Sequence, residues 1–205
     1  DGKAVHRIGP ELAEIREGGA SLSSAVPLTE NQSAAYQGPT KGGRFDVPGD
    51  TCRGWLVEPT LGTRPIWTVL KPWANGDAVT SRWPDSWIID FNDMPADQAA
   101  LLEQPFDWVV RLVKPERDGN AEKRTREMFW QFKRLGTDCR EAIKSLSTYI
   151  ATPEVSKHRV FVLLPSSVAP DKNLVVVARA DYTTFGVLQS RIHEVWALQQ
   201  GTSLE

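Results

Sequence analysis

The fold is decided between residues 149 and 196, where the sequence reads YIATPEVSKHRVFVLLPSS (149–167), a turn at APDKN (169–173), LVVVARADYTTFGV (174–187) and SRIHEVW (190–196). Runs rich in β-branched residues and bounded by turn residues are typical of strands. The spacing of apolar residues at the end of the block is typical of a helix. We therefore expect strands near residues 149–152, 157–164 and 174–180, followed by a helix from about residue 187 to residue 199.

Four polar residues, Ser156, Lys157, His158 and Arg159, stand between two of these apolar runs. Side chains alternate between the two faces of a strand, so Lys157 and Arg159 would share one face while Ser156 and His158 share the other. Cationic and hydrogen-bonding groups that leave one rigid platform together indicate a recognition surface rather than a reaction centre.

The rest of the chain predicts several short helices and a loop-rich N-terminal half. Gly and Pro punctuate residues 30–50, with a short strand near Phe45. WIIDF (87–91) is a compact apolar run that indicates a buried strand. Asp50, Asp93 and Asp138 precede helical segments as N-caps. The expected helices cover residues 50–55, 96–102, 105–113, 122–132 and 140–146, and the chain is of the α+β class with a C-terminal mixed sheet.

Length and composition indicate a single domain. The chain of 205 residues can form one substantial core, and its 40% hydrophobic and 24% charged residues are ordinary for a soluble protein. No apolar run approaches the roughly 18 residues of a membrane helix. The only cysteines, Cys52 and Cys139, lie far apart, so we expect reduced thiols in a cytoplasmic protein. Residues 1–29 are interpreted as an irregular N-terminal arm and residues 30–205 as the domain.

Charge is distributed unevenly along the chain, although the net charge is only -2. Residues 77–107 hold seven acidic residues and one arginine, whereas residues 111–159 hold twelve basic and seven acidic residues. The basic stretch is consistent with a nucleic-acid partner. It is equally consistent with a solvated helix face on which opposite charges pair.

Catalytic motifs are missing from the sequence. It contains neither a GxxxxGK[ST] phosphate loop nor a GxGxxG dinucleotide motif. His193 and Glu194 are adjacent on a predicted helix and diverge by about 100°, so they cannot share a metal. Asp90 and Asp93 could supply carboxylates, but a strand-end aspartate that caps the next helix is the simpler interpretation. We therefore assign no catalytic, cofactor or metal residue.

Four blocks carry a family resemblance. They are ENQSAAYQGPTKGGRFDVP, WIIDF, WVVRLVKPERDGN and YIATPEVSKHRVFVLLPSS with ARADYTTFGVLQSRIHEVWALQQGTSL. Together they resemble the target-recognition domain of the MmeI-like (type IIL/IIG) restriction-modification DNA methyltransferases of bacteria. The blocks span about residues 30 to 204 in the family's order.

The resemblance implies a function for the domain within a larger enzyme. Members of the family combine a nuclease segment, an S-adenosylmethionine-binding adenine-N6 methyltransferase and a recognition domain. By this resemblance we expect the chain to correspond to the recognition domain, truncated at its C-terminus. It lacks the NPP[YF] motif that holds a flipped adenine. The expected partners are duplex DNA and the methyltransferase domain of the same polypeptide. We do not expect the fragment to be an enzyme by itself. S-adenosylmethionine is expected to be a cofactor of the parent enzyme and not of this chain.

Candidate DNA contacts follow from this role. Lys157 and Arg159 come first, with Ser156 and His158 on the other face. Arg179 and Arg191 come second, with an intramolecular salt bridge as the alternative for each. The predicted phosphate contacts are Lys123, Arg124, Arg126, Lys133 and Arg134, with the solvated helix as the alternative.

Two other functions remain open at this point. The chain could be a protein-interaction module that docks neighbouring domains through its Trp-rich half, which holds five of the eight tryptophans, without reading bases. It could also be a metal-dependent nuclease that uses Asp85, Asp90 or Asp93.

Overall fold

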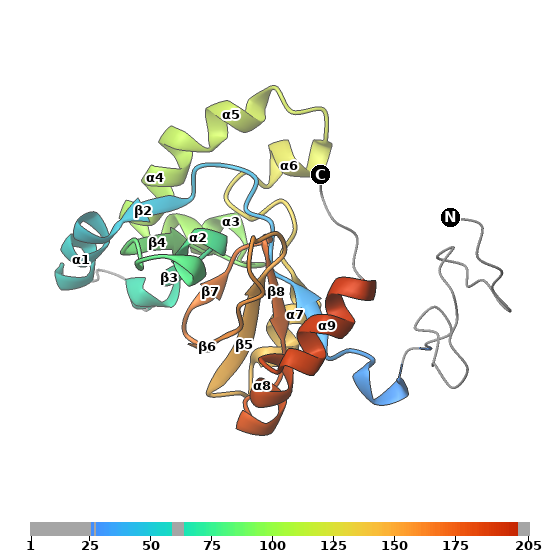
Figure 1. Cartoon of the computed structure of the whole chain (residues 1–205). Helices are drawn as coiled ribbons and strands as arrows, with labels where there is room; N and C mark the ends of the chain where they lie inside the picture. The colour runs from blue at the N-terminus through green and yellow to red at the C-terminus, as the bar shows by residue number, and fades with distance from the viewer. Residues whose placement is uncertain (1–25, 27, 59–63, 201–205) are drawn as a thin grey trace, which may run out of the picture.

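The computed structural model describes residues 26, 28–58 and 64–200 and consists of two four-stranded sheets surrounded by short helices (Figure 1). This confirms the α+β class. Almost all of the predicted N-terminal arm, residues 1–29, lies outside the described residues, as do residues 201–205 at the end of the predicted domain. The described residues therefore cover most of the predicted domain and almost none of the predicted arm.

The first sheet contains the strands predicted from the C-terminal block. Its order is β1 (Ala35–Gln37), β8 (Leu174–Val177), β5 (Thr148–Pro153) and β6 (Val162–Pro165), and all of its pairs are antiparallel. Tyr149, Leu174 and Val176 are buried together with Cys139 and Ile143 of α7 (Thr137–Ile143). The sheet is therefore rigid where β5 and β8 meet.

The second sheet has the order β2 (Asp46–Pro48), β4 (Ser86–Ile89), β3 (Leu70–Ala74) and β7 (Ala169–Pro170). Trp73 and Ala74 pair in parallel with Ala169 and Pro170, whereas the other pairs are antiparallel. The prediction of a C-terminal mixed sheet is thus corrected. β7 comes from the C-terminal block and pairs in parallel with β3 of the N-terminal half, so the mixed sheet combines both halves of the chain. β3 lies in a stretch for which the sequence predicts a loop.

Short helices cover these sheets. Three of them, α4 (Glu103–Leu112), α5 (Lys114–Asp118) and α6 (Lys123–Glu127), run one after another along the top of the view in Figure 1. Phe45, Phe91, Phe132 and Trp73 fill the larger core, where the rings of Phe45 and Phe132 meet edge to face at 5.1 Å. The remaining helices are α1 (Gly49–Val57), α2 (Gly76–Thr80), α3 (Ala96–Ala100), α8 (Tyr182–Leu188) and α9 (Arg191–Gln200), with 3-10 turns at Thr29–Asn31 and Ile66–Thr68.

Several predicted helix boundaries are wrong. The helix expected over residues 122–132 ends at Glu127, because Met128 leaves the helical region and its carbonyl accepts a bond from Arg117. The helix expected from residue 187 to 199 begins only at Arg191, as α9, and a separate helix, α8, precedes it.

The predicted caps are wrong as well. The N-cap residues of α1, α3 and α7 are Pro48, Pro95 and Gly136, so Asp50, Asp93 and Asp138 do not cap them. Instead, Asp181 caps α8 by accepting a bond from the Thr184 N–H at 2.7 Å.

None of the helices in the described ranges has the length and apolar content needed to cross a membrane.

Candidate nucleic-acid interface

The loop between β5 and β6 holds the four polar residues singled out in the sequence. The strand predicted over residues 157–164 begins only at Val162, so Lys157 and Arg159 lie outside it. β5 ends at Pro153, and the next N–H, that of Glu154, donates to the Asn173 carbonyl at 2.8 Å. Residues 154–161 pair with no strand, so the chain leaves the sheet after Pro153. The prediction of two alternating faces is therefore wrong.

The loop is tied to the protein at both ends. At its entry it is held by the Glu154 N–H bond to Asn173. At its exit, Gln189 Nε2 of the α8–α9 connection donates to the Phe161 carbonyl at 3.1 Å. Between these points the Ser156 hydroxyl donates to the His158 carbonyl. Tethering at both ends limits the conformations that the exposed tip has to lose on binding.

The tip of the loop presents exposed cations. Ser156, Lys157, His158 and Arg159 are all exposed, and within the described part of the chain neither Lys157 nor Arg159 forms an ion pair. Lys172 is exposed in the turn that precedes β8, and β8 starts at the same end of the sheet at which β5 finishes, because Pro153 pairs with Leu174. We call Ser156, Lys157, His158, Arg159 and Lys172 the sheet-end cluster.

Sequence reasoning missed Lys172, although the turn APDKN between two predicted strands was a signal for it. The chain crosses from the end of β6 through β7 to the start of β8, which places Lys172 at the end of the sheet where the loop after β5 leaves it. Three acidic groups lie in this region. Glu154 accepts from Gln37 Nε2 at 3.5 Å, Asp77 lies across a small hollow of about 240 Å³, and the buried Asp171 accepts from the Asn173 N–H at 2.9 Å.

The structure places the other candidate contacts elsewhere. Arg179 is exposed just after β8, at the opposite end of the first sheet from Lys172. Arg191 begins α9, and its Nη1 lies 3.2 Å from Glu194 Oε2, so the intramolecular alternative is present although Arg191 is highly exposed. Lys133 and Arg134 belong to an extended segment that pairs with Thr40. Lys133 Nζ lies 3.5 Å from Glu122 Oε2, and Arg134 is exposed.

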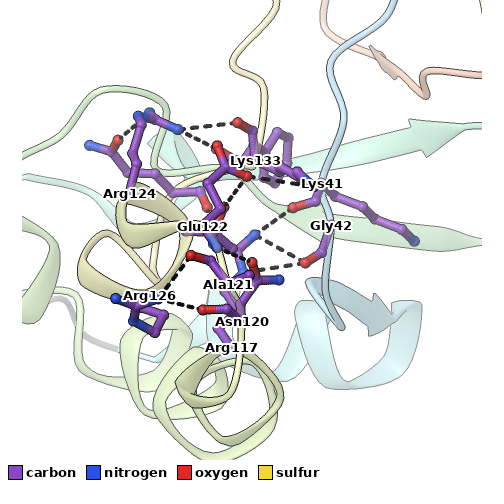
Figure 2. A network of polar contacts seen from close by, with 12 residues as sticks. Lys41, Gly42, Arg117, Asn120, Ala121, Glu122, Arg124, Arg126 and Lys133 are labelled. Atoms are coloured by element: carbon purple, nitrogen blue, oxygen red, sulfur yellow. Dashed lines mark hydrogen bonds and ion pairs between the residues drawn. The ribbon is translucent and has the colours of Figure 1, made fainter.

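Lys133 borders a group of arginines bound to backbone carbonyls, which Figure 2 shows. Arg117 is only 2% exposed, and it donates to five carbonyls at 2.6 to 3.3 Å. Burial, and then the nearby Arg124, lower the pKa of Arg117 to about 10. The guanidinium also lies 5.0 Å from the centre of the Phe45 ring. The accepting carbonyls belong to Lys41, Gly42, Met128, Phe129 and Gln131.

Gly42 is required in this arrangement. Its φ of +63° favours glycine, and a Cβ there would approach Lys133 Cβ to 2.8 Å.

Two further arginines are used in the same way. Arg124 donates to the carbonyl of Lys133 at 3.1 Å, and Arg126 donates to the carbonyls of Asn120 and Ala121 at 2.5 and 3.1 Å. We call Arg117, Arg124 and Arg126 with their acceptors the carbonyl network. Sequence reasoning missed Arg117 altogether. Arg124 and Arg126 bind backbone carbonyls, which is neither the phosphate contact nor the solvated helix face that the sequence predicts for them.

Asp90 is the second buried charge. Its carboxylate accepts from Arg140 at 2.7 and 3.0 Å and from the Asn92 N–H at 3.1 Å, and Lys71 Nζ lies at 3.3 Å. Burial alone would raise the pKa of Asp90, but Arg140, Lys71 and the Asn92 N–H hold it below its ordinary value.

The other acidic candidates also have partners. Asp85 pairs with Arg53 at 2.9 Å, which lowers the Asp85 pKa, and Asp93 accepts from Asn92 Nδ2 at 2.8 Å. Within the described ranges, His, Cys, Asp and Glu do not gather in threes as a metal site would require.

Comparison with known proteins shows a similarity of fold. No family model matches the chain, and no curated protein was found similar to it. A solved structure of the Type IIL restriction-modification enzyme MmeI in complex with DNA is similar to 94% of this chain, with a TM-score of 0.61 and 14% sequence identity. The chain spans 25% of the length of that structure. At this identity the similarity shows a shared fold.

Proposed function

We propose that the chain is a DNA target-recognition domain of a bacterial adenine-N6 DNA methyltransferase or restriction enzyme, and that it positions duplex DNA for a reaction carried out elsewhere in the parent polypeptide. The parent's methyltransferase domain would then bind S-adenosylmethionine. The observation that carries the proposal is the sheet-end cluster, whose cations have no ion-pair partner among the described residues. The shared fold with an enzyme solved on DNA supports it.

The sheet-end cluster suits both kinds of DNA contact. Arg159 carries a planar fork that matches the O6 and N7 atoms of guanine in the major groove. Lys157 and Lys172 are flexible point charges that suit phosphates, which set the register of a protein on the duplex. Because the loop is tied at Glu154 and Phe161, these side chains start from a fixed position on a rigid sheet.

The carboxylates support recognition over catalysis. A metal-dependent nuclease needs carboxylate oxygens that are free to bind the metal. Asp90 accepts from Arg140, Lys71 and the Asn92 N–H, so its lone pairs are occupied inside the protein. The nuclease alternative therefore has no support at Asp90.

DNA binding by the full chain tests the proposal. We expect fluorescence anisotropy with mixed-sequence duplexes to show an affinity that falls as salt rises, because phosphate contacts release counterions. Exchanging both Lys157 and Arg159 for Ala should weaken binding about tenfold or more at low salt and reduce the salt slope by about 2.

The matched control removes two exposed cations that already have partners, Arg44 beside Glu116 and Lys144 beside Glu141. Arg44→Ala with Lys144→Ala changes the net charge equally and should affect binding much less. Affinity that is indifferent to salt, or equal losses in both double variants, contradicts the proposal.

A second function, docking of neighbouring protein domains, is favoured by exposed apolar residues. Tyr182 of α8 is 79% exposed, and Ile192 and Trp196 of α9 are 84% and 45% exposed. In the Trp-rich half, Trp67 is 64% exposed. Apolar groups gathered on a surface mark contacts with other proteins. If Ile192→Asp and Trp196→Asp abolish assembly of the parent while the Lys157 and Arg159 variant binds DNA normally, docking is the function of the domain.

A further inference from the structure

A hollow of about 540 Å³ lies where β4 ends, away from the sheet-end cluster. Three cations from three segments line it. Arg64 precedes the 3-10 turn Ile66–Thr68, Lys71 belongs to β3 and Arg140 to α7. Arg140 is distant in sequence from Arg64 and Lys71, so the three charges meet only in the fold. The acidic residues in the wall are Asp90 and Asp93.

The buried carboxylate of Asp90 holds two of these cations in place. Its side chain is 0% exposed, while those of Lys71 and Arg140 are 36% and 20% exposed. Arg140 is fixed by two bonds to Asp90 and by a third from its Nε to the Leu135 carbonyl at 2.6 Å. Asp90 therefore positions Arg140 and Lys71 at the wall of the hollow while offering little acceptor capacity of its own.

Donors outnumber acceptors in the hollow. Arg140 uses three of its five N–H groups and Lys71 uses one of three, so both keep donors to spare. Arg64 is exposed and forms no ion pair among the residues that the structure describes. On the acceptor side, Asp93 already receives the Asn92 amide. An oxyanion with several lone pairs is the complement of such a site.

We propose that this hollow binds a phosphate group through Arg64, Lys71 and Arg140, with Asp90 as the positioning residue. A phosphate offers three or more oxygens, and the guanidinium fork and the lysine ammonium are the side chains that recognise it. The group could belong to a DNA backbone or to a free phosphate. Only the first source rests on the function proposed above.

Thermal unfolding of the full chain tests the site with inorganic phosphate as the probe. At constant ionic strength, replacing chloride by phosphate should raise the unfolding temperature of the natural chain. Arg64→Gln and Lys71→Gln should each weaken the apparent phosphate affinity about fivefold, as expected for loss of a partly exposed cation contact. Arg64→Gln leaves Asp90 and its partners intact, so it separates binding from folding.

Lys144→Gln is the matched control, because Lys144 is exposed outside the hollow and belongs to no proposed binding site. It should leave the phosphate response unchanged. Absence of a phosphate response in the natural chain, or natural affinity in Arg64→Gln, overturns the proposal.

Duplex binding of the same variants identifies the source of the phosphate. If Arg64→Gln weakens duplex binding about fivefold as well, the hollow holds a backbone phosphate. If duplex binding is unchanged while the phosphate response is lost, the hollow holds a free phosphate. If the chain binds no duplex but keeps the phosphate response, the recognition function fails and the hollow stands.

Discussion

Arg117 and Arg159 carry the same side chain in opposite surroundings. In the carbonyl network, the buried Arg117 donates to carbonyls of two chain segments, residues 41–42 and 128–131, and so joins them. In the sheet-end cluster, Arg159 is exposed on a loop and has no ion-pair partner among the described residues. The comparison teaches that the function of a cation depends on whether the protein's own acceptors already use its donors.

The strongest test of this contrast is Arg117→Met, which keeps the length of the side chain and removes the charge. Five carbonyls would lose a charged donor, that of Gln131 in a buried pair and the other four in part-buried pairs. A buried group without a partner costs about 1–3 kcal/mol. We expect unfolding in urea, followed by tryptophan fluorescence, to show a loss of about 4 kcal/mol.

Arg44→Ala is the control for Arg117→Met, because Arg44 is 63% exposed and, in the part of the chain that the structure describes, pairs only with Glu116. It should cost less than about 1 kcal/mol. If the two losses are equal, Arg117 does not hold its two segments together.

Asp90→Asn sharpens the contrast by removing a buried charge that has partners of opposite sign. Arg140 and Lys71 would be left without their carboxylate, at a cost of about 3 kcal/mol at neutral pH. The native pKa of Asp90 lies below its ordinary value of 3.8, so this stability is present above pH 3.8 and is lost as pH falls through the native pKa.

Urea unfolding of the natural chain and of Asp90→Asn from neutral pH into acid measures the effect. The difference between the two should shrink as the solution becomes acidic. Asp46→Asn, which removes a half-exposed partner of Lys41, is the control and should cost less than about 1 kcal/mol. A difference that does not depend on pH would mean that Asp90 acts through packing and not through its charge.

Buried strands could be predicted where apolar residues follow one another without interruption. WIIDF corresponds to β4, and the runs that start at Tyr149 and Leu174 correspond to β5 and β8. β3 was missed because Lys71 and Pro72 interrupt LKPWA, and proline is rare inside a central strand. Its position depends on pairing with β4 and β7, which no local pattern contains.

The candidate site divides in the same way. Lys157 and Arg159 could be chosen from the sequence because they lie between two apolar runs, and their contact with DNA stays a prediction. Their conformation could not be derived, since it depends on where β5 ends. Arg117 could not be found, because KPERD has the charge pattern of a solvated helix and its acceptors come from distant segments.

Tyr149→Phe tests the platform beneath the sheet-end cluster, with a smaller expected effect. Tyr149 is buried in β5, and its hydroxyl donates to the Val168 carbonyl at 3.0 Å. Loss of this single neutral bond should cost about 1 kcal/mol in urea unfolding. Duplex affinity should stay unchanged, because the loop is held by Glu154 and Phe161 and not by this hydroxyl. A large loss of affinity would mean that the bond shapes the loop.

The smallest expected effect belongs to the sheet-end cluster itself. Lys157→Ala with Arg159→Ala removes two exposed cations that contribute no ion pair within the described residues, so the free energy of unfolding should change by less than about 0.5 kcal/mol. Urea unfolding of this variant beside Arg117→Met measures both ends of the comparison in one experiment. A loss above about 1 kcal/mol would indicate that Lys157 and Arg159 have interaction partners within the protein. Their donors would then be used internally, as those of Arg117 are, and the argument that they are free for DNA would fail.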